Sequence, residues 1–256
     1  MHILLFFLPF LVLASTYLDP GFRDAFFFGE MGFFEISQFF ILLFLGLIFL
    51  KNYRQVKKIR SIIFSCVFFI GAMEEISWGQ SFFHFSTLPI FSKFNLQSET
   101  NLHNLIPQGF FNGVIFQLIY IFLILIPLIY YLKKESKRPG YLPSISVILH
   151  FLFSSSLQIY SYPPFKGLEK IEGFIFLILF LLCLWVLLKS NEEKKISLFI
   201  WLLCGLNSLI FLKFNHLIGL KVYEIREFFI DTAILQLVLE KRKSQLQSAL
   251  YIFAQR

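Results

Sequence analysis

The chain has 256 residues, of which 57% are hydrophobic and 15% are charged, and its mean hydropathy is +0.72. Soluble domains carry about 25% charged residues, so this composition excludes an ordinary water-soluble globule. The net charge of +7 does not require a nucleic-acid partner, because the positions of the basic residues have a topological explanation.

Long apolar runs predict an all-α, polytopic bundle of transmembrane helices. A helix needs about 20 apolar residues to cross the hydrocarbon core, whereas the strands of a β-barrel would be short and alternating. Eight runs meet or approach that length, at residues 3–18, 33–50, 61–80, 111–132, 141–160, 173–189, 196–214 and 222–240. The first run is short and ends in Leu-Ala-Ser-Thr, so a cleaved signal peptide over residues 1–18 is the alternative, with seven spans remaining.

Basic residues alternate in number from one connection to the next. Sixteen of the 23 Lys and Arg residues lie in segments 51–60, 133–138, 189–195 and 241–256. The positive-inside rule therefore places both termini in the cytoplasm, as expected for a multi-pass protein of the cell membrane. Residues 1–256 show no second domain, and we expect the extracytoplasmic loop 81–110 to fold back over the bundle.

Two adjacent carboxylates, Glu74 and Glu75, interrupt one apolar run within Gly-Ala-Met-Glu-Glu-Ile-Ser-Trp-Gly-Gln (71–80). A charged side chain near the bilayer centre costs at least ~2.5 kcal/mol, so the pair needs an explanation. Burial and a neighbouring carboxylate favour the protonated form, which suits a general acid or proton carrier. Arg226 is the nearest basic residue to this depth, so we expect neutral donors such as Trp78 and Gln38, a metal or a shared proton to hold the pair.

Polar residues on several runs lie at a similar depth. Counting along each helix places Glu74, Gln38 and Glu227 about 20 Å from the cytoplasmic edge. Close to that depth also lie Glu35, Gln117, Ser154, Ser155, Ser156, Gln158, Asn207 and Ser208. We expect an inward-facing cavity open to the extracytoplasmic side, with ordinary interhelical hydrogen bonds as the alternative for each Gln or Ser alone.

A strongly polar stretch, Asn-Leu-Gln-Ser-Glu-Thr-Asn-Leu-His-Asn (95–104), follows the acidic pair. In a helix, Glu99 would lie one turn from His103 and could orient its imidazole. A solvated loop is the alternative. The predicted substrate-binding residues are Trp78, Gln80, Asn95, Glu99, Asn101, Asn104 and Gln38.

A third polar group starts the last run. Glu224, Glu227 and Asp231 are spaced i, i+3, i+7 and form one helical stripe, with His216 just before it. Glu, Asp and His side chains can bind zinc or another divalent ion, and the predicted ligands are His103, His216 and Glu74. His150 is expected to be a buried, hydrogen-bonded histidine instead.

The blocks Glu-Glu-Ile-Ser-Trp-Gly-Gln (74–80) and Asn-Leu-His-Asn (101–104) resemble a group of uncharacterised bacterial multi-pass membrane proteins. The resemblance covers roughly residues 71–105, and it supports the choice of residues without implying a reaction. The chain is also loosely similar to seven-span hydrolases of the alkaline ceramidase type, which carry a zinc site of His and Asp, although their His-x-x-x-His pair is missing here.

These patterns favour a membrane-embedded enzyme, a hydrolase or transferase with or without a metal, acting on a lipid or lipid-linked substrate from the extracytoplasmic side. Its predicted catalytic residues are Glu74, Glu75, His103, Glu227 and Asp231. A proton-coupled transporter is the first alternative, because intramembrane carboxylates also relay protons. A structural or assembly subunit is the second.

Overall fold

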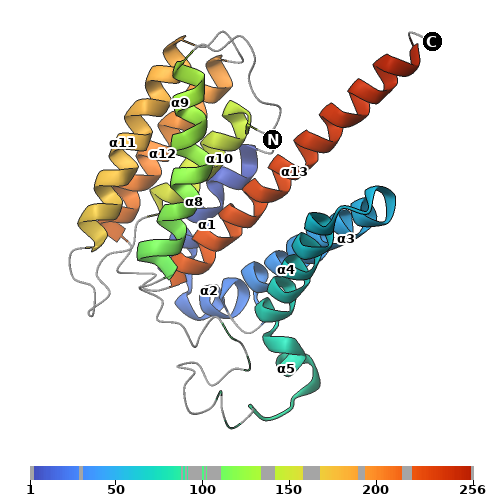
Figure 1. Ribbon diagram of the computed structural model, residues 1–256. Helices are drawn as coiled ribbons and strands as arrows, with labels where there is room; N and C mark the ends of the chain where they lie inside the picture. Colours follow the sequence, from blue (N-terminus) through green and yellow to red (C-terminus); the bar gives the residue numbers. More distant parts are fainter. Residues whose placement is uncertain are drawn as a thin grey trace.

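The computed structural model describes residues 3–28, 31–87, 89, 91, 100, 102, 111–133, 142–157, 168–189, 194–214 and 221–254. Every regular element in these ranges is a helix, which confirms the predicted all-α class. Most helices form a bundle, and a two-helix hairpin lies beside it (Figure 1). The long helix α13, Val222–Ala254, packs on both parts.

The N-terminal segment contains a short 3-10 helix, Ile3–Phe7, then α1, Leu8–Leu18, and α2, Pro20–Phe27. Asp19 separates α1 from α2 in an extended conformation. Its carboxylate accepts hydrogen bonds from the backbone N–H groups of Gly21 at 2.9 Å and Phe22 at 3.1 Å. This cap, followed by Pro20 with its fixed φ, starts α2 at that point.

Helices α3, Phe33–Val56, and α4, Ile59–Glu75, form the antiparallel hairpin. The two helices approach closely at Gly46, where an added Cβ would lie 3.0 Å from the ring of Phe69. At the same level the Ser65 hydroxyl donates to the Gly46 carbonyl oxygen at 2.9 Å. A small residue thus sets the spacing of the hairpin, as is common between membrane helices.

Helix α4 ends at Glu75, which corrects the expectation of one helix over residues 61–80. Ser77, Trp78 and Gly79 have φ values of 47°, 56° and 85°, and the chain then forms the one-turn helix α5, Gln80–Phe83. Glycine adopts this left-handed conformation readily, but serine and tryptophan do so uncommonly. Hydrogen bonds at the end of α4, described below, stabilise the turn.

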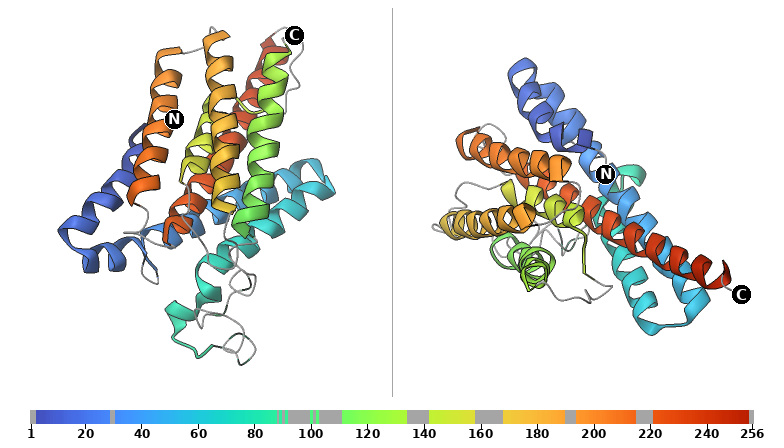
Figure 2. Two further views of the ribbon diagram at one scale, coloured as in Figure 1. Left: turned by 90° about the vertical axis from the view of Figure 1, so that its left-hand side faces the viewer. Right: turned by 90° about the horizontal axis from the view of Figure 1, so that it is seen from above.

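The bundle is built around α10, Ile145–Ser156, whose side chains are buried on nearly every side. Around α10 lie α11, Leu168–Lys189, and α12, Lys194–Phe214, together with a helix that alternates π-helical and α-helical turns. The elements of that helix are π-helical Phe111–Phe116, α8 Gln117–Tyr120, π-helical Ile121–Leu125 and α9 Ile126–Leu132. Figure 2 shows α13 running beside α3 along the edge of this bundle.

Each of the eight predicted apolar runs contains a helix in the described residues, although the run 61–80 is helical only to Glu75 before the left-handed turn. Four helices there are long and apolar enough to cross a membrane: Phe33–Val56, Val114–Leu132, Ile171–Lys189 and Lys195–Phe214. Two shorter apolar helices, Leu5–Tyr17 and Ile145–Ser156, accompany them. Eight spans and cytoplasmic termini stay predictions.

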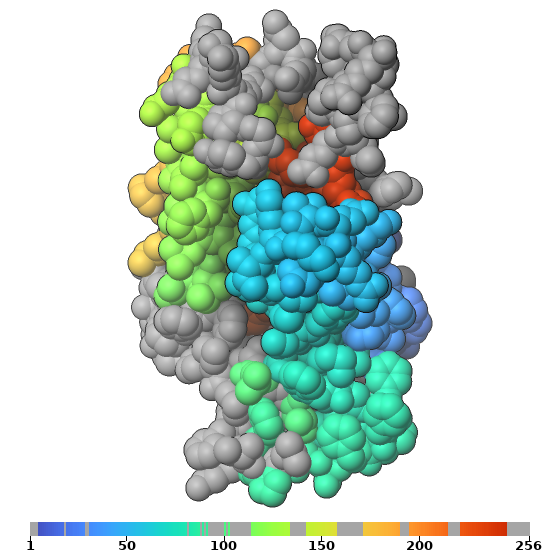
Figure 3. Space-filling view, turned by 45° about the vertical axis from the view of Figure 1, so that its right-hand side comes forward, coloured from blue at the N-terminus to red at the C-terminus, as the bar shows by residue number. Residues whose placement is uncertain are grey.

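The outer face of the hairpin is apolar. Its large exposed side chains include Phe40, Phe44 and Leu47 of α3 and Val67 and Ile70 of α4. Figure 3 shows α3 and α4 on the side of the molecule that faces the viewer. Large exposed apolar side chains on one hairpin suit contact with lipid acyl chains.

Candidate functional site

Five carboxylates from three helices gather at the end of the hairpin that is opposite its turn. Glu75, the last residue of α4, interacts electrostatically with Glu227 and Asp231 of α13 and more weakly with Glu35 of α3 and Glu224 of α13. We call these five residues, together with Gln38, the carboxylate centre. Three of the five predicted catalytic residues, Glu75, Glu227 and Asp231, are therefore within electrostatic range of one another.

Apolar packing below the centre fixes the three helices. Leu42 and Leu45 of α3 and Ala72 of α4 are buried against one another. Partly buried residues of α13 pack on the same cluster, namely Ile234, Leu235 and Val238. These residues continue α13 directly from the acidic stripe, so the packing that buries one segment carries the carboxylates of the next toward α3 and α4.

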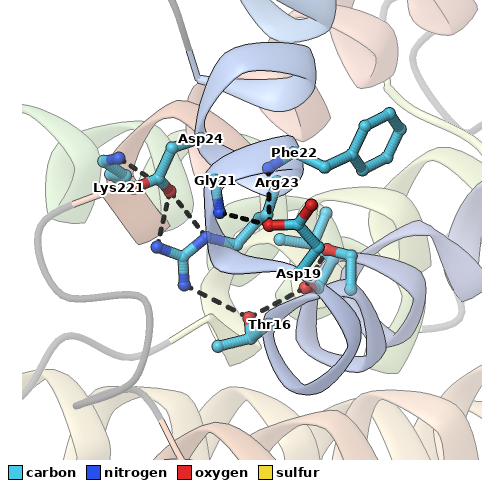
Figure 4. Close-up of polar contacts among 9 residues, drawn as sticks. Thr16, Asp19, Gly21, Phe22, Arg23, Asp24 and Lys221 are labelled. Carbon is cyan, nitrogen blue, oxygen red and sulfur yellow. Dashed lines mark hydrogen bonds and ion pairs between the residues drawn. The ribbon is translucent and has the colours of Figure 1, made fainter.

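A network outside the centre attaches the start of α13 to α2. Asp24 accepts hydrogen bonds or ion-pair contacts from Arg23 at 2.5 Å and from Lys221 at 2.9 Å (Figure 4). Arg23 also donates to the hydroxyl of Thr16 at 3.2 Å. Lys221 directly precedes Val222, the first residue of α13, so this network holds the first turn of the helix that carries Glu224.

The helix dipoles favour a negative charge on some carboxylates of the centre and disfavour it on another. Glu35 and Glu224 lie in the first turns of α3 and α13, where the positive end of the dipole favours an anion. The Glu35 carboxylate also accepts the backbone N–H of Met31 at 2.8 Å. Glu75 ends α4, where the dipole is negative and disfavours an anion. Glu75 therefore has the strongest electrostatic reason to bind a proton or a positive charge.

Gln38 lies beside the carboxylates and is 1% exposed. Its side-chain amide hydrogen-bonds the Asp231 carboxylate. The amide oxygen, Oε1, is buried without a hydrogen-bond partner. An unsatisfied buried acceptor costs about 1–3 kcal/mol, so this oxygen is suited to receive a donor that the chain itself does not supply.

Glu74 has a different environment from Glu75. Its carboxylate accepts the indole N–H of Trp78 at 2.5 Å and the backbone N–H of Leu102 at 2.5 Å, and the residue is 8% exposed. Both donors are neutral, which confirms that expectation for Glu74. The bond from Trp78 forms although α4 has already ended, because the left-handed turn returns the indole to the carboxylate.

Gln80 reinforces the contact between the end of α4 and the loop. Its side-chain oxygen accepts the backbone N–H of Thr100 at 2.7 Å, and its amide nitrogen donates to the Thr87 hydroxyl at 2.8 Å. Thr100 and Leu102 are thus both held by side chains of the 74–80 block. The predicted site residues Asn95, Glu99, Asn101, His103, Asn104 and His216 lie outside the described residues, so their roles stay predictions.

Among the polar residues predicted at one depth, Gln158 lies outside the described residues, and contacts of the others define two groups. One is the carboxylate centre on α3, α4 and α13. In the other, hydroxyl and amide groups join the bundle helices: Tyr120 to Ser154 at 3.1 Å, and Asn207 to Ser156 at 2.7 Å. Interhelical hydrogen bonding, the alternative given to these residues, therefore applies to Ser154, Ser156 and Asn207.

His150 belongs to the same hydrogen-bonded bundle. Its two ring nitrogens contact the Gln236 side-chain oxygen and the Thr232 hydroxyl, each at 3.0 Å, and it is 2% exposed. A buried, hydrogen-bonded histidine is therefore confirmed.

Arg226 carries the positive charge of the bundle core. Its guanidinium forms an ion pair with Glu172 of α11 at 3.3 Å and donates to the Leu157 carbonyl oxygen at 2.9 Å, and the residue is 1% exposed. Sequence reasoning missed Glu172, although its position just before the apolar run 173–189 was a usable signal. The ion pair joins α13 to α11 across the bundle.

Metal binding gains no support from the described part of the chain. In those ranges no group of three or more His, Cys, Asp and Glu side chains is placed to hold a metal ion. Of the predicted ligands, His103 and His216 lie outside the described residues and Glu74 bonds to Trp78 and Leu102.

The chain was also compared with known proteins. No family model, curated protein or solved structure matches it, so the centre is interpreted from its own residues.

Proposed function

We propose that this chain is a membrane-embedded enzyme, a hydrolase or transferase of the bacterial inner membrane that acts on a lipid or lipid-linked substrate from the extracytoplasmic side. The observation that carries the proposal is the convergence of Glu227, Asp231, Glu35 and Glu224 on Glu75. Carboxylates that share a site can hold a proton between them, which is what general acid–base catalysis needs.

The two adjacent glutamates take different roles. Glu75 would give its proton to the leaving oxygen of the substrate as the scissile bond breaks. Asp231 or Glu227 would accept the proton of the attacking water or alcohol, so protons balance over the reaction. Glu74 is a positioning residue, because its carboxylate is engaged by Trp78 and by the backbone of Leu102. His103, oriented by Glu99, stays a predicted second base.

Lipid analysis of cells tests the proposal. In cells lacking the gene, we expect one lipid class to accumulate, and the wild-type chain should restore the normal profile. Glu75→Gln should fail to do so, with turnover reduced by about 10²- to 10⁴-fold, the usual contribution of a general acid or base. The control is Glu240→Gln, a carboxylate on α13 that lies nine residues, or about 14 Å, beyond Asp231. An unchanged profile in the deletion strain and in Glu75→Gln would refute an enzyme of this kind.

The orientation is tested separately. A reporter fused after Arg60, Arg138 or Lys195 should be cytoplasmic, and one within 92–100 should be extracytoplasmic. A periplasmic signal from the Arg60 fusion would place the centre on the cytoplasmic side instead.

A proton-coupled carrier is the second candidate, favoured by the stripe of Glu224, Glu227 and Asp231, which extends about 10 Å along α13. Proteoliposomes distinguish the two functions. A carrier moves solute with protons and leaves lipids unchanged, whereas the enzyme converts a lipid without a proton gradient. Metal analysis of the purified protein tests metal assistance in either case.

A further inference from the structure

The carboxylate centre is rich in acceptors. A carboxylate oxygen accepts hydrogen bonds wherever it carries no proton, and the amide oxygen of Gln38 is also an acceptor. That oxygen is buried without a partner next to Asp231, to which the same side chain is bonded. A group that completes this centre must therefore bring hydrogen-bond donors.

The same group must also bring positive charge. The main electrostatic neighbours of Glu75 are four carboxylates, and those of Asp231 include Glu227. Glu75 additionally lies at the negative end of the α4 dipole. A cation placed among Glu75, Asp231 and Gln38 would relieve this repulsion and satisfy the amide oxygen together.

We infer that the carboxylate centre binds a primary ammonium group, carried by a lipid head group or by a free amine, against Asp231, Glu75 and the Gln38 side-chain oxygen. This inference rests on the proposed function and names the class of substrate that the centre would take.

An ammonium group fits these observations better than the other cations. It presents three N–H donors in addition to its charge, whereas a quaternary ammonium presents none. Its contacts with acceptor oxygens are about 2.8 Å long, against about 2.0–2.2 Å for zinc, so it accepts wider spacing between ligands. In the described residues no three metal-binding side chains are close enough for a metal ion, while several carboxylates still interact with Glu75.

Binding measurements on the purified full chain in detergent micelles test this inference. The probes are phosphatidylethanolamine, phosphatidylcholine, glycerophosphoethanolamine without acyl chains, and Zn²⁺ or Mn²⁺ alone. We expect phosphatidylethanolamine to bind at least tenfold more tightly than phosphatidylcholine. Titration calorimetry in two buffers of different ionisation enthalpy should show a proton released on binding, because the cation displaces a shared proton from Asp231, whereas Glu75 keeps the proton that it donates in the proposed reaction.

Variants locate the binding. Asp231→Asn and Gln38→Leu should each weaken binding of phosphatidylethanolamine at least tenfold, and Glu240→Gln should leave it unchanged. Gln38 is buried, so Glu227→Gln, at a partly exposed position, is the replacement if either variant fails to fold. Comparable binding of glycerophosphoethanolamine would identify the head group alone as the ligand, whereas binding of the lipid alone would show that acyl chains are needed, and both support the inference.

Four results would overturn the ammonium site. Phosphatidylcholine could bind as tightly as phosphatidylethanolamine, or a metal could bind stoichiometrically while neither amine binds. The variants could bind phosphatidylethanolamine with unchanged affinity, or no probe could bind at all. Loss of lipid conversion in Glu75→Gln together with any of these results would refute the ammonium site and leave the proposed enzyme standing. Amine binding with an unchanged lipid profile would refute the enzyme and leave the site.

Discussion

Charged groups in the bundle core and in the carboxylate centre have opposite kinds of neighbours. In the bundle, Arg226 is matched by Glu172 and by the Leu157 carbonyl oxygen, and both charged residues are buried. In the carboxylate centre, Glu75 faces four other carboxylates, and a buried amide oxygen beside them has no partner. Arg226 and Glu172 neutralise each other within the bundle, whereas Glu75 lies among like charges that a proton or a bound cation would neutralise.

The contrast assigns the charges of the bundle to stability and those of the carboxylate centre to function. A buried ion pair that loses one partner leaves an uncompensated charge, which is strongly destabilising. A carboxylate among like charges loses repulsion when it is neutralised. Charge-removing substitutions in the two regions should therefore have opposite effects on the free energy of unfolding.

The largest effect is expected at Arg226. Arg226→Met should lower the free energy of unfolding by about 3–5 kcal/mol, because Glu172 would remain buried without its cation. Unfolding by sodium dodecyl sulfate in mixed micelles measures this. The double variant with Glu172→Leu should recover much of the loss, since both charges are then gone. A loss below about 1 kcal/mol in the single variant would remove the contrast between the two regions.

A smaller effect on the free energy of unfolding is expected at Glu74, and none or a gain at the adjacent Glu75. Glu74→Gln should cost about 1.5–3 kcal/mol, because the new amide nitrogen would face one of the two N–H donors, Trp78 or Leu102. Glu75→Gln should leave stability unchanged or raise it, because it removes one of several like charges. The same unfolding assay compares them, and equal losses in both variants would contradict separate roles.

Sequence alone predicted much of this arrangement. Hydropathy located the helices because a helix that is able to cross a membrane requires a continuous apolar run, and each run contains a described helix. Depth counted along the runs brought Glu227 and Gln38 to the level of the acidic pair. That estimate needs no knowledge of packing, since rise per residue is constant in a helix.

What the sequence could not predict depends on contacts between distant segments. The end of α4 at Glu75 depends on the indole N–H of Trp78 and the backbone N–H of Leu102, which both donate to Glu74. It also depends on left-handed conformations at Ser77 and Trp78, which these residue types disfavour. The pairing of Arg226 with Glu172 depends on how α11 is rotated about its axis, which a nearly uniform apolar run does not specify. For the same reason, depth along each helix could not distinguish the hydroxyl groups of the bundle from the carboxylates on α3, α4 and α13.

A modest effect is expected for the neutral hydrogen bonds of the bundle. Tyr120→Phe removes the bond to the Ser154 hydroxyl and should cost about 0.6 kcal/mol, the average for such bonds between membrane helices. Lipid conversion should be unaffected. Loss of conversion at full stability would mean that this group contributes to the site after all.

A comparably small effect is expected for Asp24, whose charge is matched by Lys221 and Arg23 but exposed to solvent. Burial alone would raise the pKa of Asp24, but hydrogen bonds and charge from Lys221 and Arg23 outweigh it and hold the pKa below its ordinary value of 3.8. The folded state therefore binds this proton less readily than the unfolded state, so Asp24 stabilises the fold above pH 3.8 and loses that contribution as the pH falls below it. The Asp24 side chain is 43% exposed, so its contacts are screened by solvent and the contribution is about 0.2–1 kcal/mol. Asp24→Asn should lower the free energy of unfolding by that amount at pH 7, less at high salt, and the difference from wild type should vanish in acid. A loss as large as that of Arg226→Met would show that burial is not what separates strong from weak charge pairs in this protein.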